Sequence, residues 1–492
     1  MTRRLISIAL LCAGLASQTS AGDYFILLGG GAGPASSEVS IEKNVEWISA
    51  LLDSRGHKDH DVLFAAGLQD PTRDVKTNRV DPELSGLWLP IARVYGNRAR
   101  LFEAFHKNTV ARSANAASRE NALDLLQQRL TAMQAGDNLM LVYNGHGGGS
   151  DEDPSQHHLR LWDNTSLTVA DLVQTLEQQP PQTVFRFVLP QCYSGPFLRT
   201  IHQQLSIGES GPVNTARCGF TAAPHHRKSE GCTEVEDERE YVDYSTYFFA
   251  ALDGRSRLGQ ALSRDPDTNG DGLVGLNEAH FYAATESYSR DVPGATSEYF
   301  LQQWQPWYVR GQTWSYPESS GDGHYALMAR SVAARLGFPV DLDHVMLVRE
   351  VSGRRTALEA QINGLEAEVR ALRQRELDLR GELARAGTSR WPELRNPYGV
   401  NFNALEPENI GEISAWLQSR PLYTELESVQ NEIDAGNVNI LGMERDLGMH
   451  LRILRWLELS RLEYFLYRFG SGAEISSYES LQHCESWTGL GE

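Results

Sequence analysis

The chain has 492 residues, of which 41% are hydrophobic and only 20 are prolines. Its length predicts at least two domains, and its composition excludes a disordered chain. The formal net charge is −19 at pH 7 and there is no basic stripe, which argues against nucleic-acid binding.

The N-terminus has the pattern of a secretory signal peptide. Two arginines precede an apolar run over residues 5–16, and small residues at 19–21 offer a cleavage site. A lipoprotein anchor at Cys12 is disfavoured because Leu11 before it is bulky. We therefore expect residues 1–21 to be removed. No run of about 18 apolar residues follows, so we expect a periplasmic or secreted protein without a membrane span.

The next residues alternate between strand and helix patterns. Residues 23–28 and 61–66 are short apolar runs typical of buried strands, and residues 41–56 between them have an apolar helical face. This order predicts a parallel sheet with helices on its faces. The glycine run at 29–33 lacks the third glycine and the lysine of nucleotide-binding loops, so we expect it to rim the sheet. Residues 70–118 are predicted to be irregular.

Two later strands each end in a small-residue turn that carries a reactive side chain. Strand 138–143 runs into a glycine-rich turn with His146, and strand 183–189 runs into a turn with Cys192. A helix capped at Thr168 lies between them and supplies the crossover that makes the two strands parallel. Both turns should therefore open at the same sheet edge, where ligands collect in open α/β sheets.

These residues resemble a known family. A strand followed by His-Gly, a crossover, and a strand followed by Cys-x-x-Gly is similar to the caspase, metacaspase and legumain group of cysteine peptidases, in which about 50 residues separate the His from the Cys. The matching segments are Tyr143-Asn144-Gly145-His146-Gly147 and Gln191-Cys192-Tyr193-Ser194-Gly195. The resemblance covers residues 23–330. It implies a caspase-like parallel-sheet sandwich with helices on both faces, in a secreted member of bacterial type.

The resemblance also implies a catalytic mechanism. His146 would take the proton of Cys192 and later protonate the leaving amine, because a thiol with a pKa of roughly 8.5 is mostly protonated at neutral pH. The backbone N–H groups of Gly147 and Cys192 would stabilise the oxyanion. Gln191 departs from the many relatives that carry an acidic residue or alanine immediately before the cysteine. The alternative is that the pair is a relic of the fold and that the cysteine is a packing residue.

An acidic loop follows the strand predicted near residues 217–223. Its acids are Glu230, Glu234, Glu236, Asp237, Glu238, Glu240 and Asp243. One of these carboxylates in the substrate pocket would select Arg or Lys before the cleaved bond, and the acids at 151–153 are a second source. The alternative is a solvated acidic surface. The histidine doublets at 157–158 and 225–226 lack ligand-spaced partners, so no structural zinc site is expected among them.

Residues 267–278 fit the twelve-residue calcium loop of EF-hands at every demanding position. The predicted ligands are the side chains of Asp267, Asn269 and Asp271, the carbonyl of Leu273 and the bidentate carboxylate of Glu278. Gly272 would make the sharp turn. With a single loop of this kind visible, we expect structural Ca²⁺ rather than a calcium sensor; the alternative is a polar turn without metal.

The cysteine pattern leaves two pairings open. Cys218 and Cys232 lie close enough in sequence to form a disulfide, which an exporting compartment allows. A bond between Cys192 and Cys484 would instead remove the proposed nucleophile, and the sequence does not exclude it.

The last third predicts a helical hairpin. Apolar residues recur in alternating steps of four and three along a coiled-coil seam. The seam consists of Leu358, Ile362, Leu365, Val369, Leu372, Leu379 and Leu383, with Glu376 in its one gap. A second helical pattern covers residues 426–462, and we expect it to pack antiparallel against the first helix in a hairpin that stands off the first domain. The alternatives are that the seam dimerises the protein or binds a partner. Aromatic residues at 304–316 are expected to close the first core; the alternative is that they line a substrate groove.

The sequence therefore predicts a four-part chain. The parts are a signal peptide (1–21), a caspase-like peptidase domain (22–340), a helical hairpin (341–470) and a tail (471–492) that is either poorly ordered or docked by Trp487. The predicted function is a secreted cysteine endopeptidase (a hydrolase) that acts on peptides or proteins. The alternative function is a non-catalytic, calcium-stabilised scaffold or binding protein that acts through its hairpin.

Overall fold

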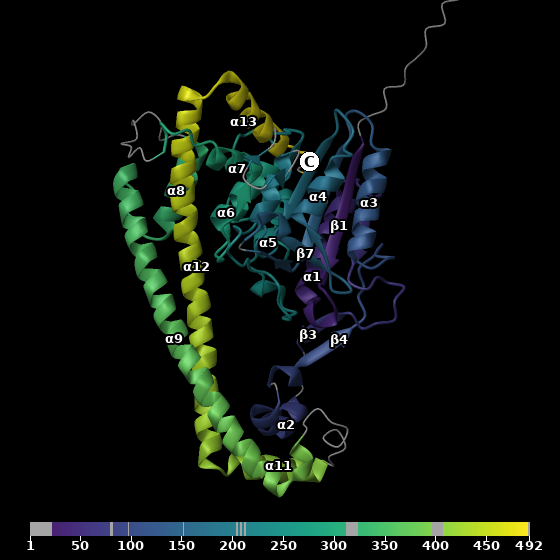
Figure 1. The fold of residues 1–492 in the computed structure, drawn as a ribbon, viewed down its shortest axis with the longest axis vertical. Helices are drawn as coiled ribbons and strands as arrows, with labels where there is room; N and C mark the ends of the chain where they lie inside the picture. Colours follow the sequence, from purple (N-terminus) through teal and green to yellow (C-terminus); the bar gives the residue numbers. More distant parts are fainter. Residues whose placement is uncertain are drawn as a thin grey trace, which may run out of the picture.

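The computed structural model describes residues 22–78, 82–96, 98–150, 152–202, 205–206, 209–210, 213–310, 323–395 and 407–490 (Figure 1). The predicted signal peptide, the first residue of the acidic segment 151–153 and the end of the aromatic stretch 304–316 lie outside these ranges. Within them, no helix is long and apolar enough to cross a membrane.

A six-stranded sheet forms the centre of the first domain. Its strand order is β13-β12-β9-β5-β1-β2, and every neighbouring pair is parallel except β12 with β13. The strands are β1 (Asp23–Gly30), β2 (Asp61–Phe64), β5 (Asn138–Gly145), β9 (Val184–Leu189), β12 (Arg217–Thr221) and β13 (Gly294–Ala295). The prediction of a parallel-dominated α/β sheet is confirmed, and so is the adjacency of the two strands that precede His146 and Cys192.

Helices cover both faces of this sheet because successive strand side chains point to opposite sides. In β1, Phe25 and Leu27 join one core, and Ile26 and Leu28 join the other. The first core is completed by α1 (Val39–Ser54), α5 (Tyr244–Asp253) and α6 (Leu276–Glu286). The second is completed by α3 (Arg119–Ala132) and α4 (Val169–Leu176), whose Thr168–Asp171 capping box is present as predicted.

Residues 70–118 are more regular than the sequence indicates. They contain the antiparallel pair β3 (Val75–Asn78) and β4 (Glu103–His106), and the helix α2 (Pro82–Tyr95). The prediction of an irregular segment was wrong because the two strands are only four residues long and because Pro90 lies inside the helix, where proline normally ends it.

Two small antiparallel sheets complete the first domain. One follows the His146 turn and consists of β6 (Gly147–Gly148), β7 (His158–Leu161) and β8 (Thr165–Thr168). The other consists of β10 (Leu205–Ser206) and β11 (Glu209–Ser210). The first of these sheets fixes the chain that leaves the histidine turn.

The C-terminal part is built on two long helices. They are α9 (His344–Arg390) and α12 (Pro421–Phe469), which lie side by side over their length (Figure 1). They are antiparallel, because Arg375 pairs with Glu425 while a Cβ on Gly436 would meet Val369. The predicted hairpin is confirmed. Glu376, the polar residue in the gap of the apolar seam, accepts a hydrogen bond from Gln430 of α12 at 3.0 Å.

The remaining helices attach this hairpin to the first domain. They are α7 (Thr296–Gln303), α8 (His324–Arg335), α11 (Pro407–Gln418) and α13 (Gly472–Glu485). The upper part of the hairpin shares a core with α6, α7, α8 and α13, and its far end shares a core with α2 and α11 (Figure 1). The expectation that the hairpin stands off the first domain was therefore wrong.

Arg452 of α12 explains why the hairpin is held against the domain. Its side chain is 1% exposed and donates to the carbonyl oxygens of Ala284, Ser289 and Asp291 at 2.7–2.9 Å. Burial lowers the pKa of this guanidinium to about 10, so it stays charged at neutral pH. A buried charge with this many acceptors fixes the position of α12, because loss of the acceptors would leave it unpaired.

A disulfide ties the tail to the sheet. Cys218 in β12 bonds to Cys484 in α13, which packs over β12 and β9. The expected Cys218–Cys232 bond was wrong: Cys218 is fully buried in its strand, and Cys232 is exposed on a distant loop. The tail is docked rather than disordered, and Trp487 lies 6.1 Å from the Phe25 ring, centroid to centroid.

Candidate active site

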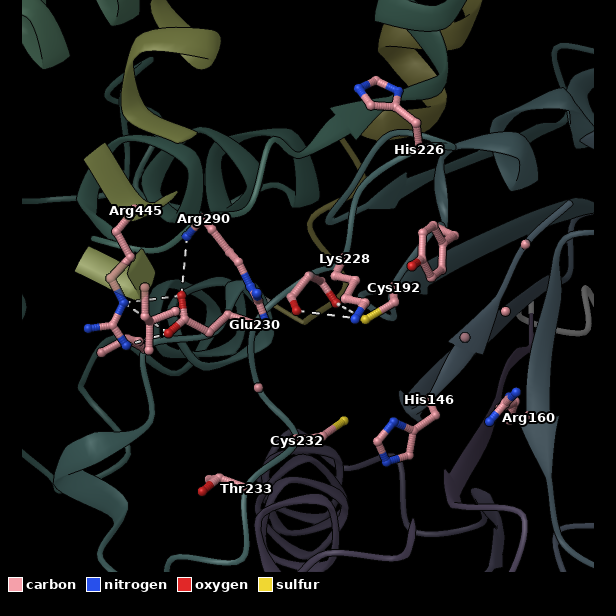
Figure 2. A pocket seen from close by; sticks show the side chains of 18 of the residues that line it. His146, Arg160, Cys192, His226, Lys228, Glu230, Cys232, Thr233, Arg290 and Arg445 are labelled. Atoms are coloured by element: carbon pink, nitrogen blue, oxygen red, sulfur yellow. Dashed lines mark hydrogen bonds and ion pairs between the residues drawn. The ribbon is translucent and has the colours of Figure 1, made fainter. Parts of the chain in front are cut away.

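Three residues of the candidate site follow strands near the point where the strand order reverses. Strand β1 has β2 on one side and β5 on the other, and ligands in open α/β sheets bind outside the carboxyl ends of strands at such a point. Glu38 follows β1, His146 follows β5, and Cys192 follows β9. His146 and Cys192 face the same opening (Figure 2).

His146 is held at both its backbone and its ring. Its carbonyl oxygen accepts hydrogen bonds from the Tyr143 hydroxyl and the Arg160 N–H, both at 2.8 Å. Its Nε2 lies 2.9 Å from a carboxylate oxygen of Glu38, the residue that precedes α1. Because Nε2 is engaged by Glu38, Nδ1 is the ring nitrogen available to the thiol. Sequence reasoning found no third member, since an acid before a helix is typical of a solvated helix start.

Cys192 is presented by a strained turn. The next residue, Tyr193, has a φ of 60°, a left-handed conformation that is uncommon for a residue with a side chain. Its N–H donates to the carbonyl of Arg227 at 2.9 Å, which holds the turn in place. The half-buried thiol lies 3.7 Å from both the carbonyl and the hydroxyl oxygen of Ser229. No described residue accepts a hydrogen bond from the Cys192 N–H.

Gly147 lies against the nucleophile turn. A Cβ at this position would come within 2.1 Å of the Cys192 carbonyl oxygen and 2.6 Å of Gln191 Cγ. Only glycine therefore lets the histidine turn and the cysteine turn pack this closely. Gln191 is 2% exposed, and neither atom of its side-chain amide has a hydrogen-bond partner among the described residues.

The two histidine doublets differ in burial and in their contacts. His157 is buried, and its two ring nitrogens lie 2.9 Å from the Tyr193 carbonyl and 3.0 Å from the Ser150 carbonyl. It thus braces the cysteine turn from behind. His225 and His226 are exposed at the cleft, with ring centroids 4.7 Å apart.

The site opens into a cleft of about 1050 Å³ whose far wall is α12. That wall contributes Leu441 and Arg445, two residues that sequence reasoning assigned to the hairpin alone. Arg445 donates through Nε to Glu230 at 2.9 Å, so it binds the cleft loop directly (Figure 2). Four guanidinium or ammonium groups line the cleft against two carboxylates: Arg160, Lys228, Arg290 and Arg445, with Glu230 and Glu240.

Most acids of the predicted acidic loop are engaged elsewhere. Their partners are Lys76 for Glu234, Thr77 for Glu236, Arg239 for Asp237, Arg257 for Glu238 and the N-terminus of α5 for Asp243. Glu230 and Glu240 do line the cleft, but Glu230 is paired with Arg445. Glu240 has no ion pair with a described residue. Of the second acidic segment, Asp153 caps a short helix.

A second thiol lies in the cleft. The ligand atoms of Cys232, Glu38 and His146 all lie within 4.8 Å of one another. Cys232 as a whole residue is exposed. Desolvation of its thiol and the nearby Glu38 carboxylate raise its pKa well above the usual range. These three side chains are the described residues best placed to share a metal ion.

The predicted calcium loop has the expected backbone turns. The Asp267 carboxylate accepts the Gly272 N–H at 2.9 Å, and Gly272 has a φ of 86°, which favours glycine. Asn269 and Asp271 each accept the N–H two residues further on, at 2.8 and 2.9 Å, the second donor being Leu273. The donor set consists of oxygens, which is what Ca²⁺ prefers.

The Glu278 carboxylate is bonded to N–H groups of the loop. Its carboxylate accepts the N–H groups of Thr268 and Gly275 at 2.8 and 3.0 Å. The carboxylates of Asp267, Asp271 and Glu278 do not all lie within 4.8 Å of one another. The residues thus suit calcium in kind and order, and binding would require Glu278 to exchange backbone donors for the ion.

Comparison with known proteins gives no closer guide. No family model and no curated protein matches the chain. A crystal structure of a Geobacter sulfurreducens protein, a structural-genomics target, resembles it with a TM-score of 0.33 and 13% sequence identity. That likeness covers 56% of this chain and 92% of the other protein, and at this level it supports no statement about activity.

Proposed function

We propose that this chain is a secreted or periplasmic cysteine endopeptidase of the caspase-like group, with Cys192 as nucleophile and His146 as general base. The observation that carries the proposal is that these two residues follow the carboxyl ends of adjacent parallel strands and line the same cleft, which is wide enough for a peptide. Glu38 is the positioning residue that fixes the histidine.

The mechanism starts with proton transfer from the Cys192 thiol to Nδ1 of His146. Glu38 accepts a hydrogen bond from the Nε2–H group, which leaves the lone pair on Nδ1 to take the thiol proton. The thiolate attacks the peptide carbonyl carbon, and the carbonyl electrons move to its oxygen. The backbone N–H groups of Cys192 and Gly147 would stabilise this oxyanion, each contributing about 3 kcal/mol.

Collapse of the tetrahedral intermediate breaks the C–N bond. The amine leaves with the proton held by His146, and a thioester to Cys192 remains. A water molecule, deprotonated by the same nitrogen, then attacks the thioester and releases the new carboxylate and the free thiol. Ca²⁺ at residues 267–278 would act structurally, since that loop runs into the first turn of α6 and is not among the residues lining the cleft.

The charges of the cleft bear on substrate choice. Once the pairs of Arg445 with Glu230 and of Arg290 with Glu444 are set aside, two cations, Arg160 and Lys228, line the cleft with one carboxylate, Glu240. This small excess of positive charge favours acidic peptide segments. The expected preference for Arg or Lys before the cleaved bond now depends on Glu240, the cleft carboxylate without an ion pair to any described residue. Peptide libraries distinguish the two readings through the residue before each cut.

The proposal is tested with the mature chain and its Cys192→Ala variant, each incubated with an unstructured protein mixture. Wild type should create new N-termini and Cys192→Ala should create none, because alanine removes only the thiol. Equal patterns from both proteins would contradict the proposal. A folded wild-type chain that cleaves nothing would favour the non-catalytic scaffold.

A further inference from the structure

The strongest unassigned feature of the molecule is the cluster of Glu38, His146 and Cys232. Within the described residues, it is the one group of three His, Cys, Asp or Glu side chains placed to hold a metal ion. The Cys232 thiol points toward the His146 ring from the opposite wall (Figure 2). The proposed mechanism uses two members of the cluster and leaves the thiol without a role.

The loop that carries Cys232 is fixed to the same helix start as Glu38. Ser40, in the first turn of α1, donates to the Gly231 carbonyl at 3.0 Å and accepts the Thr233 N–H at 2.9 Å. Gly231 and Thr233, the two neighbours of Cys232, are therefore both hydrogen-bonded to Ser40, which lies two positions after Glu38. The three side chains are held together by the backbone, so their proximity does not depend on a chance rotamer.

The donor types select zinc among common ions. A thiolate, an imidazole and a carboxylate are the three ligand kinds of protein zinc sites, whereas Ca²⁺ and Mg²⁺ prefer oxygen ligands alone. In tetrahedral zinc sites the donor atoms lie about 3.5 Å apart. Nε2 and the Glu38 oxygen are already at 2.9 Å, and the exposed Cys232 side chain can rotate to close the remaining gap.

We propose that Glu38, His146 and Cys232 bind Zn²⁺ and that this site inhibits the enzyme. The inhibition rests on the proposed peptidase function; the binding does not. Water would complete the tetrahedral coordination in the open cleft. Zinc and peptide hydrolysis would exclude each other because both require the same imidazole.

The proton balance explains the inhibition. In the metal-free site Nε2 carries the proton, bonded to Glu38, and Nδ1 carries the lone pair that takes the thiol proton. Zinc occupies the Nε2 lone pair, so the single proton of the neutral imidazole must reside on Nδ1. The Cys232 proton leaves to solvent as its thiolate binds the ion. With a proton on Nδ1 and a metal on Nε2, His146 can no longer accept the proton of Cys192.

Zinc binding is measured by competition with a chromogenic zinc indicator, using the mature chain in millimolar calcium so that the loop at 267–278 is saturated. Wild type should bind one Zn²⁺ per chain. Cys232→Ser and Glu38→Gln should each weaken binding by at least roughly a hundredfold, because each loses a direct ligand. Cys192→Ser and His225→Ala are matched controls within the same cleft and should bind as wild type does.

Two results would overturn the inference. One is the absence of zinc binding by wild type, and the other is unchanged affinity in Cys232→Ser together with lost affinity in Cys192→Ser, which would place the ion on the dyad alone. Inhibition by zinc is measured for each protein relative to its own metal-free rate of peptide hydrolysis. Cys232→Ser should need at least roughly a hundredfold more Zn²⁺ than wild type for the same fractional inhibition. Binding that depends on Cys232 in a chain without peptidase activity would retain the site and reject the proposed function.

Discussion

Replacing Glu38 by glutamine should slow the reaction of Cys192 with iodoacetamide. The carboxylate accepts the Nε2 proton of His146 at 2.9 Å, and its charge stabilises the imidazolium that forms when Nδ1 takes the thiol proton. Glutamine has the same length and offers an amide oxygen to the same N–H. The substitution therefore removes the charge and keeps the neutral hydrogen bond.

The magnitude follows from that difference. A hydrogen bond to a charged group is about twice as strong as a neutral one, and a neutral one contributes about 1 kcal/mol. The loss is thus about 1–1.5 kcal/mol, or about tenfold in rate. A larger electrostatic loss is not expected, because the side chains of Glu38 and His146 are 12% and 27% exposed and water screens the pair.

The assay compares two thiols in one protein. Alkylation of Cys192 and Cys232 is followed over time at neutral pH by mass spectrometry of their peptides. Because the Glu38 carboxylate contributes to the raised pKa of Cys232, Glu38→Gln should speed that thiol while it slows Cys192. Glu42→Gln is the matched control: Glu42 is a buried acid of the same helix whose carboxylate pairs with His106 at 2.7 Å.

An unchanged Cys192 rate in folded Glu38→Gln would refute the positioning role of Glu38. Equal slowing in Glu38→Gln and Glu42→Gln would also refute it, because general damage to α1 would then explain both. A melting temperature for each variant shows whether the helix has kept its place.

Three other predictions concern stability and specificity. Chelation of calcium should lower the melting temperature of wild type and leave the melting temperature of Glu278→Gln unchanged. Equal shifts in the two proteins would show that calcium does not bind at residues 267–278. Burial raises the pKa of Glu485 from 4.5 to about 7, so its protonated form stabilises the folded state at low pH, and about 3 kcal/mol of this stability is lost as the pH rises from 4.5 through 7. Over this pH range the melting temperature of Glu485→Gln should fall less than that of wild type. Identical pH profiles of the two proteins would contradict this role of Glu485. Glu240→Gln should abolish any preference for Arg or Lys in a peptide library, and a preference that persists would locate it elsewhere.

The sequence was sufficient for the parts of the site that depend on local pattern. Apolar runs of four to eight residues ended by small-residue turns identified β5 and β9, and the helix between them required the strands to be parallel. That reasoning placed His146 and Cys192 at one edge. The apolar heptad seam of α9 likewise predicted that a second helix packs against it, since one apolar stripe must be covered by another. That helix is α12.

The missed residues come from segments that only the folded chain brings together. Glu38 and Cys232 are 194 positions apart, and each looks like an ordinary loop residue in its own segment. Arg445 belongs to a helix that the sequence assigned to the hairpin alone. The partner of Cys218 is 266 residues away, and no spacing rule connects them. Such contacts depend on how α12 and α13 dock, which periodicity does not encode.

The central claim is that His146 activates Cys192, and the alkylation rate of Cys192 in wild type and His146→Ala tests it most directly. In wild type Cys192 should react far faster than Cys232, whose raised pKa keeps it protonated. In His146→Ala the Cys192 rate should fall to that of an ordinary thiol. Similar slow labelling of both cysteines in wild type, or a Cys192 rate that survives in His146→Ala, would contradict the account.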